Sequence, residues 1–258
     1  MSLAHAPVLL YHGVRDRPVA GLERWTLSRA AFAAHVEAIV ASGRTPLTMS
    51  ALAACLRGDA GAALPERPVA ITFDDGWADT RDAVELLAAR GIASTTYVQT
   101  GRLGGADWLD AAGVRALDAL GDGVEIGAHT VDHPRLDELS GVPLAREVAG
   151  SKAHLEDVLG HPVAGLAYPH GAHDARSRAA VVAAGFTHAA AVKDALSHPG
   201  DDPFAIARWT VTDGVGPERL LAVLDGDGAR VVRAGDRPRT VAYRTARRLR
   251  RRLTGARA

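Results

Sequence analysis

Cysteine and long apolar runs are the two features that this sequence most clearly lacks. The 258 residues include a single cysteine, so an intrachain disulfide and a zinc site built from several cysteines are both excluded. No stretch of eighteen apolar residues occurs, which excludes a membrane-spanning helix of ordinary length. The opening residues carry no basic start of the kind that a secretory signal needs. We therefore expect a cytoplasmic enzyme or binding protein.

Lysine is also scarce, and the basic residues gather near the end of the chain. Nine arginines and no acidic residue lie in residues 237–258, whereas residues 1–236 carry a net charge of −9. We expect residues 1–228 to form one domain and residues 229–258 to form an arginine-rich tail. Such a tail is expected to be solvated, with at most weak contact with a membrane surface. No nucleic-acid partner is expected, and the oligomeric state is left open.

Apolar residues make up 47% of the chain, which is enough to bury the core of one barrel-sized domain. Short apolar runs alternate with longer alanine-rich segments. The short runs predict strands over 7–11, 69–73, 94–98, 124–128, 165–169 and 188–192. The longer segments predict helices over 28–42, 48–57, 80–90, 110–120, 144–159 and 175–184. This alternation indicates an α/β fold with a largely parallel sheet.

Polar clusters follow three of the expected strands at the point where each strand ends. Asp74 and Asp75 come after the second strand, His129 after the fourth, and the Tyr-Pro-His-Gly sequence at 168–171 after the fifth. In parallel α/β folds, ligands bind at the carboxyl ends of the strands, and in barrels those ends meet on one face. Residues 95 positions apart in this sequence can therefore share one site.

The aspartate pair and a histidine pair together suggest a metal site. Adjacent carboxylates repel each other unless a cation lies between them or one is protonated. His129 and His133 have the i and i+4 spacing that places two imidazoles on one face of a helical turn, as in many zinc sites. Two histidines and one carboxylate leave coordination positions open, and the other aspartate is free to act as a base. This set is sufficient for metal-assisted hydrolysis of an amide or ester.

The order of these motifs resembles the polysaccharide deacetylase family, the NodB-homology domain of carbohydrate esterase family 4. The matching segments are Thr-Phe-Asp-Asp-Gly at 72–76, His-Thr-Val-Asp-His at 129–133 and the strand that ends at 168–171. The resemblance implies a distorted (β/α) barrel with fewer than eight regular strands in a single domain. It also implies removal of N- or O-acyl groups from sugars with the help of a divalent metal.

The resemblance also implies separate roles for the four motif residues. Asp74 would be the general base, and Asp75 would bind the metal together with His129 and His133. This ligand set suits zinc best, with cobalt, nickel and iron as alternatives.

The general acid is expected near the start of the chain. Most family members carry this histidine late, in a Leu-x-His motif, and the match at 196–198 lies before the expected last strands. The order of motifs is permuted in the branch that resembles poly-N-acetylglucosamine deacetylases, where a Tyr-His pair after the first strand supplies the acid. His12 fits that role, and His198 and His170 are the alternatives.

The chain departs from the family pattern around the third motif. Many members have Arg-Pro-Pro-Tyr-Gly where this chain has Ala-Tyr-Pro-His-Gly at 167–171, so the arginine that orients the base is absent there. We expect Arg208 to reach the base from another strand. The resemblance implies that the backbone amide of His170 donates to the oxyanion, with Tyr168 nearby. Three tryptophans are candidates for stacking on a sugar ring: Trp77, Trp108 and Trp209.

These residues predict a metal-dependent hydrolase that removes an N-acyl group, acetyl first, from an amino sugar or glycoconjugate. One alternative is a hydrolase of a cyclic imide, ureide or formamide on the same scaffold. Another is an inactive carbohydrate- or metal-binding module. Because no export signal is seen, a lipid-linked, nucleotide-linked or antibiotic-precursor sugar is favoured over an extracellular polymer.

Overall fold

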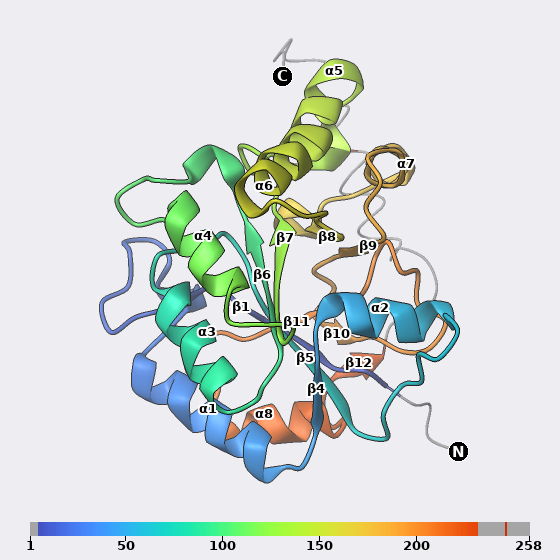
Figure 1. The fold of residues 1–258 in the computed structure, drawn as a ribbon. Helices are drawn as coiled ribbons and strands as arrows, with labels where there is room; N and C mark the ends of the chain where they lie inside the picture. The colour runs from blue at the N-terminus through green and yellow to red at the C-terminus, as the bar shows by residue number, and fades with distance from the viewer. Residues whose placement is uncertain (1–4, 232–245, 247–258) are drawn as a thin grey trace.

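A computed structural model describes residues 5–231 and residue 246 of the chain (Figure 1). The strands are β1 (Val8–Tyr11), β2 (Gly13–Val14), β3 (Thr26–Leu27), β4 (Thr45–Leu47), β5 (Pro68–Phe73), β6 (Ser94–Val98), β7 (Val124–Ala128), β8 (Gly165–Ala167), β9 (His188–Ala190), β10 (Ala195–Leu196), β11 (Trp209–Thr210) and β12 (Arg230–Val231). The α-helices are α1 (Arg29–Ala41), α2 (Met49–Arg57), α3 (Thr80–Ala89), α4 (Ala111–Asp118), α5 (Gly141–Ala145), α6 (Ser151–Leu159), α7 (Ala175–Ala183) and α8 (Pro217–Leu224).

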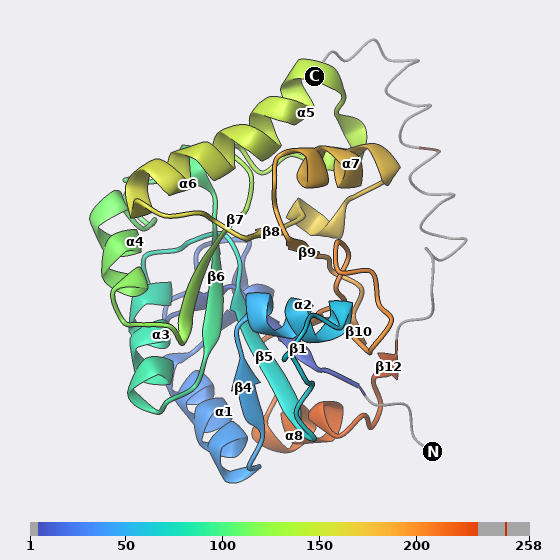
Figure 2. The ribbon, with the colours of Figure 1, turned by 45° about the vertical axis from the view of Figure 1, so that its right-hand side comes forward.

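The central sheet is entirely parallel and curls toward a barrel. Its strand order is β11-β1-β5-β6-β7-β8-β9, with β4 paired beside β5. The chain before β11 pairs with β9 through an isolated bridge between Ala190 and Ile206, so one segment joins the two ends of the sheet. Figure 2 shows the strands side by side with helices around them. The fold is the distorted (β/α) barrel in a single domain that the motifs implied.

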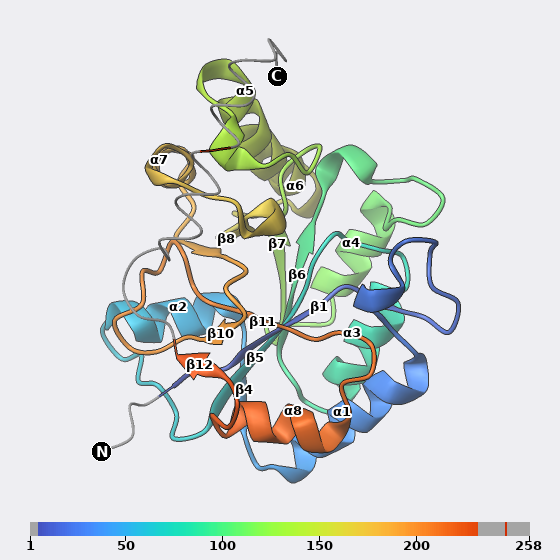
Figure 3. The ribbon, with the colours of Figure 1, turned by 180° about the vertical axis from the view of Figure 1, so that it is seen from behind.

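Alternation along the strands separates two apolar clusters. In β1 and β5, Leu9, Tyr11, Ile71 and Phe73 belong to the larger cluster, which lies between the sheet and the outer helices. Val8 and Ala70 point to the other face and belong to a smaller cluster that includes residues of α2, which contacts β4, β5 and β9. Outside the barrel, α1 lies between α3 and α8, as Figure 3 shows for α1 and α8. The helices therefore hold the strands so that all their carboxyl ends open on one side.

The expected helix ends are largely confirmed. Ser28 caps α1 by accepting a hydrogen bond from the Ala31 amide, and Gly58 and Gly160 adopt left-handed conformations after α2 and α6. The helix expected over 144–159 contains a π-helical turn, Arg146–Gly150, between α5 and α6. An extra residue in that turn interrupts the regular hydrogen bonding, which hydrophobic periodicity does not reveal.

The short strand β12 pairs with β10 just beyond the expected domain boundary at residue 228. Most of the predicted arginine-rich tail lies outside the described residues. No helix in the described part of the chain is both long and apolar enough to cross a membrane.

Candidate active site

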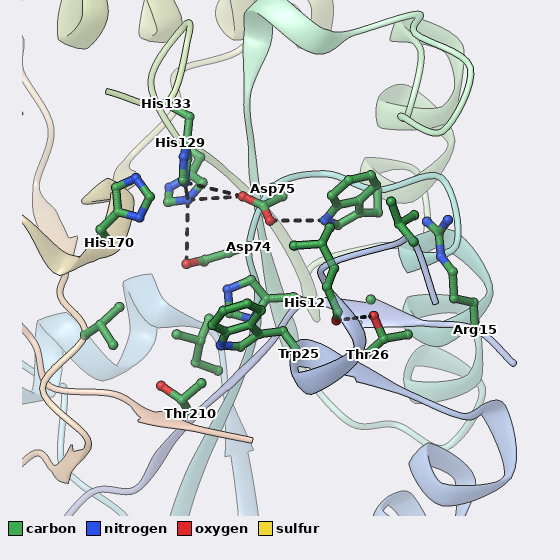
Figure 4. Close-up of a pocket in the computed structure, with 16 residues that line it drawn as sticks. His12, Arg15, Trp25, Thr26, Asp74, Asp75, His129, His133, His170 and Thr210 are labelled. Atoms are coloured by element: carbon green, nitrogen blue, oxygen red, sulfur yellow. Dashed lines mark hydrogen bonds and ion pairs between the residues drawn. The ribbon is translucent and has the colours of Figure 1, made fainter. Parts of the chain in front are cut away.

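A cavity of about 280 Å³ opens at the carboxyl ends of the strands (Figure 4). It brings together residues that the sequence separates by up to 200 positions, from Leu10 to Thr210. The predicted site residues that line it are His12, Asp74, Asp75, Trp77, His129, His133 and His170. Arg208 lies behind this lining, whereas Tyr168, Trp209 and the alternative acid His198 are not part of it.

The two aspartates after β5 have different hydrogen-bond partners. Asp75 has a φ angle of 77°, an uncommon conformation for a residue other than glycine. Its Oδ1 accepts a hydrogen bond from the Gln99 side chain at 2.7 Å, and its Oδ2 accepts one from the Trp77 indole at 3.1 Å. The backbone turn and two donors therefore fix Asp75 in one orientation.

His129 and His133 meet in a loop after β7, and the expectation that they share a helical turn is wrong. His133 has a φ of 59° and Thr130 a φ of 66°, so the segment reverses direction without forming a helix. The Thr130 hydroxyl accepts a hydrogen bond from the His133 amide at 3.0 Å, which stabilises the turn. The i and i+4 spacing brings the imidazoles together through this turn, with their ring centroids 4.7 Å apart.

The donor atoms of Asp75, His129 and His133 fit a single metal ion. The two Nε2 atoms are 3.1 Å apart, and Asp75 Oδ1 lies 3.6 and 3.5 Å from them. Ligand atoms about 2 Å from a zinc ion are about 3 to 3.5 Å apart in a tetrahedral arrangement. His129 Nδ1 lies 2.8 Å from the carbonyl oxygen of Ala167 and can donate to it, which leaves Nε2 as a lone-pair donor. Among the residues that the structure describes, Asp75, His129 and His133 form a group of potential metal ligands whose donor atoms all lie within 4.8 Å of one another.

Asp74 is buried and paired with Arg208. The guanidinium donates to both carboxylate oxygens, at 2.6 and 2.8 Å, and its side chain is fully buried. Burial acts to raise the pKa of Asp74, but attraction to Arg208 and His129 outweighs it and holds that pKa well below its ordinary value. Asp74 Oδ2 is also 3.7 Å from His129 Nε2. An ionised carboxylate is thus held directly beside the candidate ligands.

Arg208 reaches Asp74 from the segment that precedes β11, and not from the third motif. It also donates to the Thr72 hydroxyl at 3.2 Å and to the Ala191 carbonyl at 3.3 Å. The Tyr97 ring lies 5.5 Å from the guanidinium carbon. These contacts fix the guanidinium inside the barrel, where it faces one carboxylate.

His12 follows β1 and lies on the side of the cavity opposite His133 (Figure 4). Burial lowers its pKa below the ordinary value, although attraction to Asp75 and Asp74 partly opposes this shift. Its Nδ1 is buried and has no hydrogen-bond partner among the described residues. His12 is thus a buried imidazole in the lining of the cavity.

Two of the predicted substrate contacts are corrected by the structure. The amide of Tyr168 donates to the Ala190 carbonyl at 2.9 Å, and its buried ring stacks on His173, so Tyr168 does not line the cavity. Trp209 packs against the outer apolar cluster, because alternation along β11 turns its neighbour Thr210 toward the cavity instead. Trp77 does line the cavity, but it stacks on Trp108 at 4.1 Å and is 9% exposed.

His170 remains at the cavity, with its ring 4.6 Å from that of His133. Its φ of 57° turns the backbone at the end of β8. The expected role of its amide as an oxyanion donor stays a prediction.

Sequence reasoning missed three residues that shape the site. Gln99 holds Asp75, and it directly follows a predicted strand, which is the rule that identified the other polar residues. Glu147 accepts hydrogen bonds from the amides of Val131 and Asp132 in the histidine loop, at 3.0 and 2.9 Å. Trp25 lines the cavity mouth, and no sequence pattern distinguished it from the other tryptophans.

Comparison with known proteins places this geometry in a family. The family model for polysaccharide deacetylases matches residues 61–189, half of the chain. YxkH of Bacillus subtilis (strain 168), named as a polysaccharide deacetylase, is 24% identical over 86% of this chain and 77% of its own length. The Streptococcus pyogenes deacetylase PplD, solved in complex with acetate, is 21% identical with a TM-score of 0.78, over 86% of this chain and 99% of its own. IcaB from Ammonifex degensii has a TM-score of 0.72 and 24% identity, over 85% and 97% of the two chains. The chain belongs to the polysaccharide deacetylase family.

Proposed function

We propose that this protein is a metal-dependent hydrolase that removes an N-acyl group, acetyl first, from an amino sugar or glycoconjugate. One observation carries the proposal. A buried, arginine-paired carboxylate lies beside three side chains whose donor atoms are 3.1 to 3.6 Å apart. A binding module needs neither an ionised base nor a histidine across the cavity from it. The arrangement therefore favours hydrolysis over binding alone.

Asp75, His129 and His133 would hold the divalent ion, and zinc suits this ligand set best among zinc, cobalt, nickel and iron. When bound, such an ion polarises an acyl oxygen and makes a nearby water more acidic. Gln99 and Trp77 would keep the Asp75 carboxylate in place, and the hydrogen bond to Ala167 would do the same for His129.

Asp74 would accept the proton of the attacking water. Arg208 keeps this carboxylate ionised and fixes both of its oxygens, so the base does not rotate away from the reacting carbon. Asp74 would therefore act as the base, because Arg208 holds its carboxylate, and Asp75 would act as a metal ligand, because its carboxylate faces the two histidines.

His12 would donate a proton to the departing amine. An amine leaves poorly unless it is protonated, and His12 lines the cavity near Asp75 and Asp74, whose negative charges favour its protonated form against the effect of burial. The amide of His170 would donate to the developing oxyanion from the opposite side.

The acyl group and the sugar are supported by the family and by one neighbour. The matched family acts on polysaccharides by its name, and the PplD structure contains acetate. The cavity of about 280 Å³ suits a small acylated group together with part of a sugar better than a long polymer segment.

A substrate panel tests the proposal. We expect metal-loaded protein to release acetate from N-acetylglucosaminides and not to open cyclic imides or ureides. Replacement of Asp74 by asparagine should abolish most of this release while metal content is retained. Turnover of imides without acetate release would favour the alternative hydrolase, and no turnover of either class would favour a binding module.

A further inference from the structure

One wall of the cavity is built by a single segment, residues 15–25, which joins β2 to β3. Val19, Leu22 and Trp25 of this segment line the cavity with apolar surface. The candidate catalytic groups, His12 and Asp74 among them, supply polar surface to the same cavity. The cavity is therefore amphipathic, with apolar and polar surface facing the same space.

Trp25 is not part of the apolar core, so core packing does not explain a tryptophan at this position. It is 37% exposed and is the one aromatic residue among the exposed large apolar side chains of the described chain. Trp77 and Trp209, in contrast, pack against Trp108 and against the outer cluster. An exposed indole at the rim of an active-site cavity is better explained by contact with a ligand than by folding.

The segment is held in place, so the indole is presented in an ordered way. The Trp25 amide donates to the Leu22 carbonyl at 3.0 Å, and the Asp213 amide donates to the Arg24 carbonyl at 2.8 Å. Arg15, at the start of the segment, forms a two-point ion pair with Asp79, at 2.7 and 2.9 Å. A surface that is ordered before binding loses little entropy when the ligand arrives.

A pyranose ring has the matching chemistry. One face of such a ring presents mainly C–H groups, whereas its edges carry hydroxyl and amide groups. An aromatic plane opposite polar groups accommodates this shape, and a flat indole gains more from a ring face than a branched aliphatic side chain does. A longer acyl chain would gain nearly as much from leucine as from tryptophan.

We infer that Trp25, with Leu22 and Val19, forms the subsite that binds the C–H face of the sugar ring carrying the scissile amide. This inference rests on the proposed function, because it identifies the part of the substrate that the segment recognises. Trp25 would thus determine specificity for sugars over other amides.

The test compares two amides that differ in the ring. Acetate release from methyl N-acetylglucosaminide and from N-acetylethanolamine is measured for wild type, Trp25→Phe, Trp25→Leu and Trp25→Ala. We expect Trp25→Ala to lower the ratio of the two kcat/KM values about tenfold, through a higher KM for the glucosaminide. Trp25→Phe should keep most of the wild-type ratio of the two kcat/KM values, whereas Trp25→Leu should not. Val40→Ala, at an exposed apolar position on α1 away from the cavity, is the matched control.

Several results would overturn the inference. The first is an unchanged ratio of the two kcat/KM values in Trp25→Ala, and the second is a wild-type ratio in Trp25→Leu. The third is a loss of kcat/KM in Trp25→Ala that grows with the length of the acyl group on the same sugar. Calorimetric binding of the same glucosaminide to Asp74→Asn protein, with and without Trp25→Ala, separates this inference from the proposed function. Absence of acetate release by wild type would refute the proposed function, whereas weaker binding upon loss of Trp25 would still support the subsite. Equal binding would refute the subsite even if turnover is normal.

Discussion

Two neighbouring carboxylates acquire different properties at this site because their surroundings differ. Asp74 lies on the barrel side of the β5 end, where Arg208 binds both of its oxygens. Asp75 is turned by its positive φ toward His129 and His133. The proposed division of the two aspartates into base and ligand rests on this geometry, and it leads to opposite expectations for metal content.

Replacing Asp74 by asparagine should retain stoichiometric metal and lower kcat by ~10²–10⁴-fold, the usual contribution of a general base. The substitution leaves Arg208 without its buried partner, so the free energy of unfolding should also fall by about 3 kcal/mol. Metal analysis, turnover and thermal unfolding of one preparation check all three. Loss of the metal in this variant would mean that the two aspartates have exchanged roles or share the ion.

Replacing His12 by alanine should lower kcat for an amide substrate by ~10²–10⁴-fold, because the amine then leaves without a proton. The kcat for an activated aryl acetate should fall much less, because this substrate has a good leaving group. Rates on both substrates measure the difference, with His198→Ala as the control because His198 does not line the cavity. Equal losses on amide and ester, or an inactive His198→Ala protein, would place the acid elsewhere.

The histidine loop depends on the π-helical turn between α5 and α6. Thr130 and His133 both have positive φ angles, a conformation that is unfavourable for residues with side chains. The π-helical turn carries Glu147, whose buried carboxylate accepts the amides of Val131 and Asp132. One carboxylate thus satisfies two amides of the strained loop that carries His133.

Replacing Glu147 by alanine should raise the dissociation constant for zinc more than tenfold, because two loop amides lose their acceptor and His133 is no longer fixed. Replacement by glutamine keeps an acceptor oxygen and should recover part of the affinity. Zinc titration against a competing chelator measures both. Glu85→Ala, on the exposed side of α3, is the control for loss of a carboxylate. Wild-type zinc affinity in Glu147→Ala would show that the loop holds its shape without this contact.

At the level of elements, the sequence predicted most of the regular structure but not the details that depend on tertiary contacts. Periodicity and capping residues located the long helices, and buried apolar runs located the main strands. The short strands β2, β3, β4, β10 and β12 escaped notice because two or three residues carry no periodicity. The His129–His133 segment was predicted to be helical because i and i+4 spacing is typical of a helical turn, although a tight loop can bring the same two residues together. The loop is stabilised by hydrogen bonds to the Thr130 hydroxyl and the Glu147 carboxylate, which the spacing alone does not reveal.

Across the whole molecule, the barrel interior contains polar groups as well as apolar ones. Tyr97 fills the interior because Gly127 has no side chain; a Cβ there would lie 2.5 Å from the ring. His188 is likewise fully buried beside Gly165, and its Nε2 is 3.8 Å from a Glu125 oxygen. Sequence patterns could not show this, because both residues lie in short runs that read as ordinary strands.

Burial lowers the pKa of His188, only partly opposed by attraction to Glu125. The unfolded chain therefore takes up a proton near pH 6.5 before the folded protein does, and stability falls as the pH drops below about 6.5. We expect His188→Gln to reduce the slope of this decline between pH 6.5 and 5, as measured by chemical denaturation at several pH values.

His161 provides a control, because its pKa is shifted in the opposite direction to that of His188. The Asp118 hydrogen bond raises its pKa, so His161 adds stability on the acidic side and loses it as the pH rises. His161→Gln should leave the acidic decline unchanged or slightly steeper. An unchanged slope in His188→Gln would show that the decline arises from other buried histidines, such as His35, whose pKa burial also lowers.

The overall architecture and the site location followed from one rule, that polar residues after parallel strands converge. The rule placed Asp74, Asp75, His129 and His170 around one cavity, but it could not tell which side chains face inward. Tyr168 and Trp209 were misassigned for that reason, since orientation depends on how each strand pairs with its neighbours.

The most direct test of the central claim is acetate release from an N-acetylglucosaminide by chelator-stripped protein as zinc is added back. We predict that stripped protein is inactive and that turnover rises in proportion to zinc until one ion is bound per chain. His129→Ala and His133→Ala proteins should show no such rise at the same zinc concentrations. Full turnover by stripped protein would contradict the assignment of this cavity as a metal-dependent deacetylase site. Normal zinc-dependent turnover in the His129→Ala and His133→Ala proteins would contradict it as well.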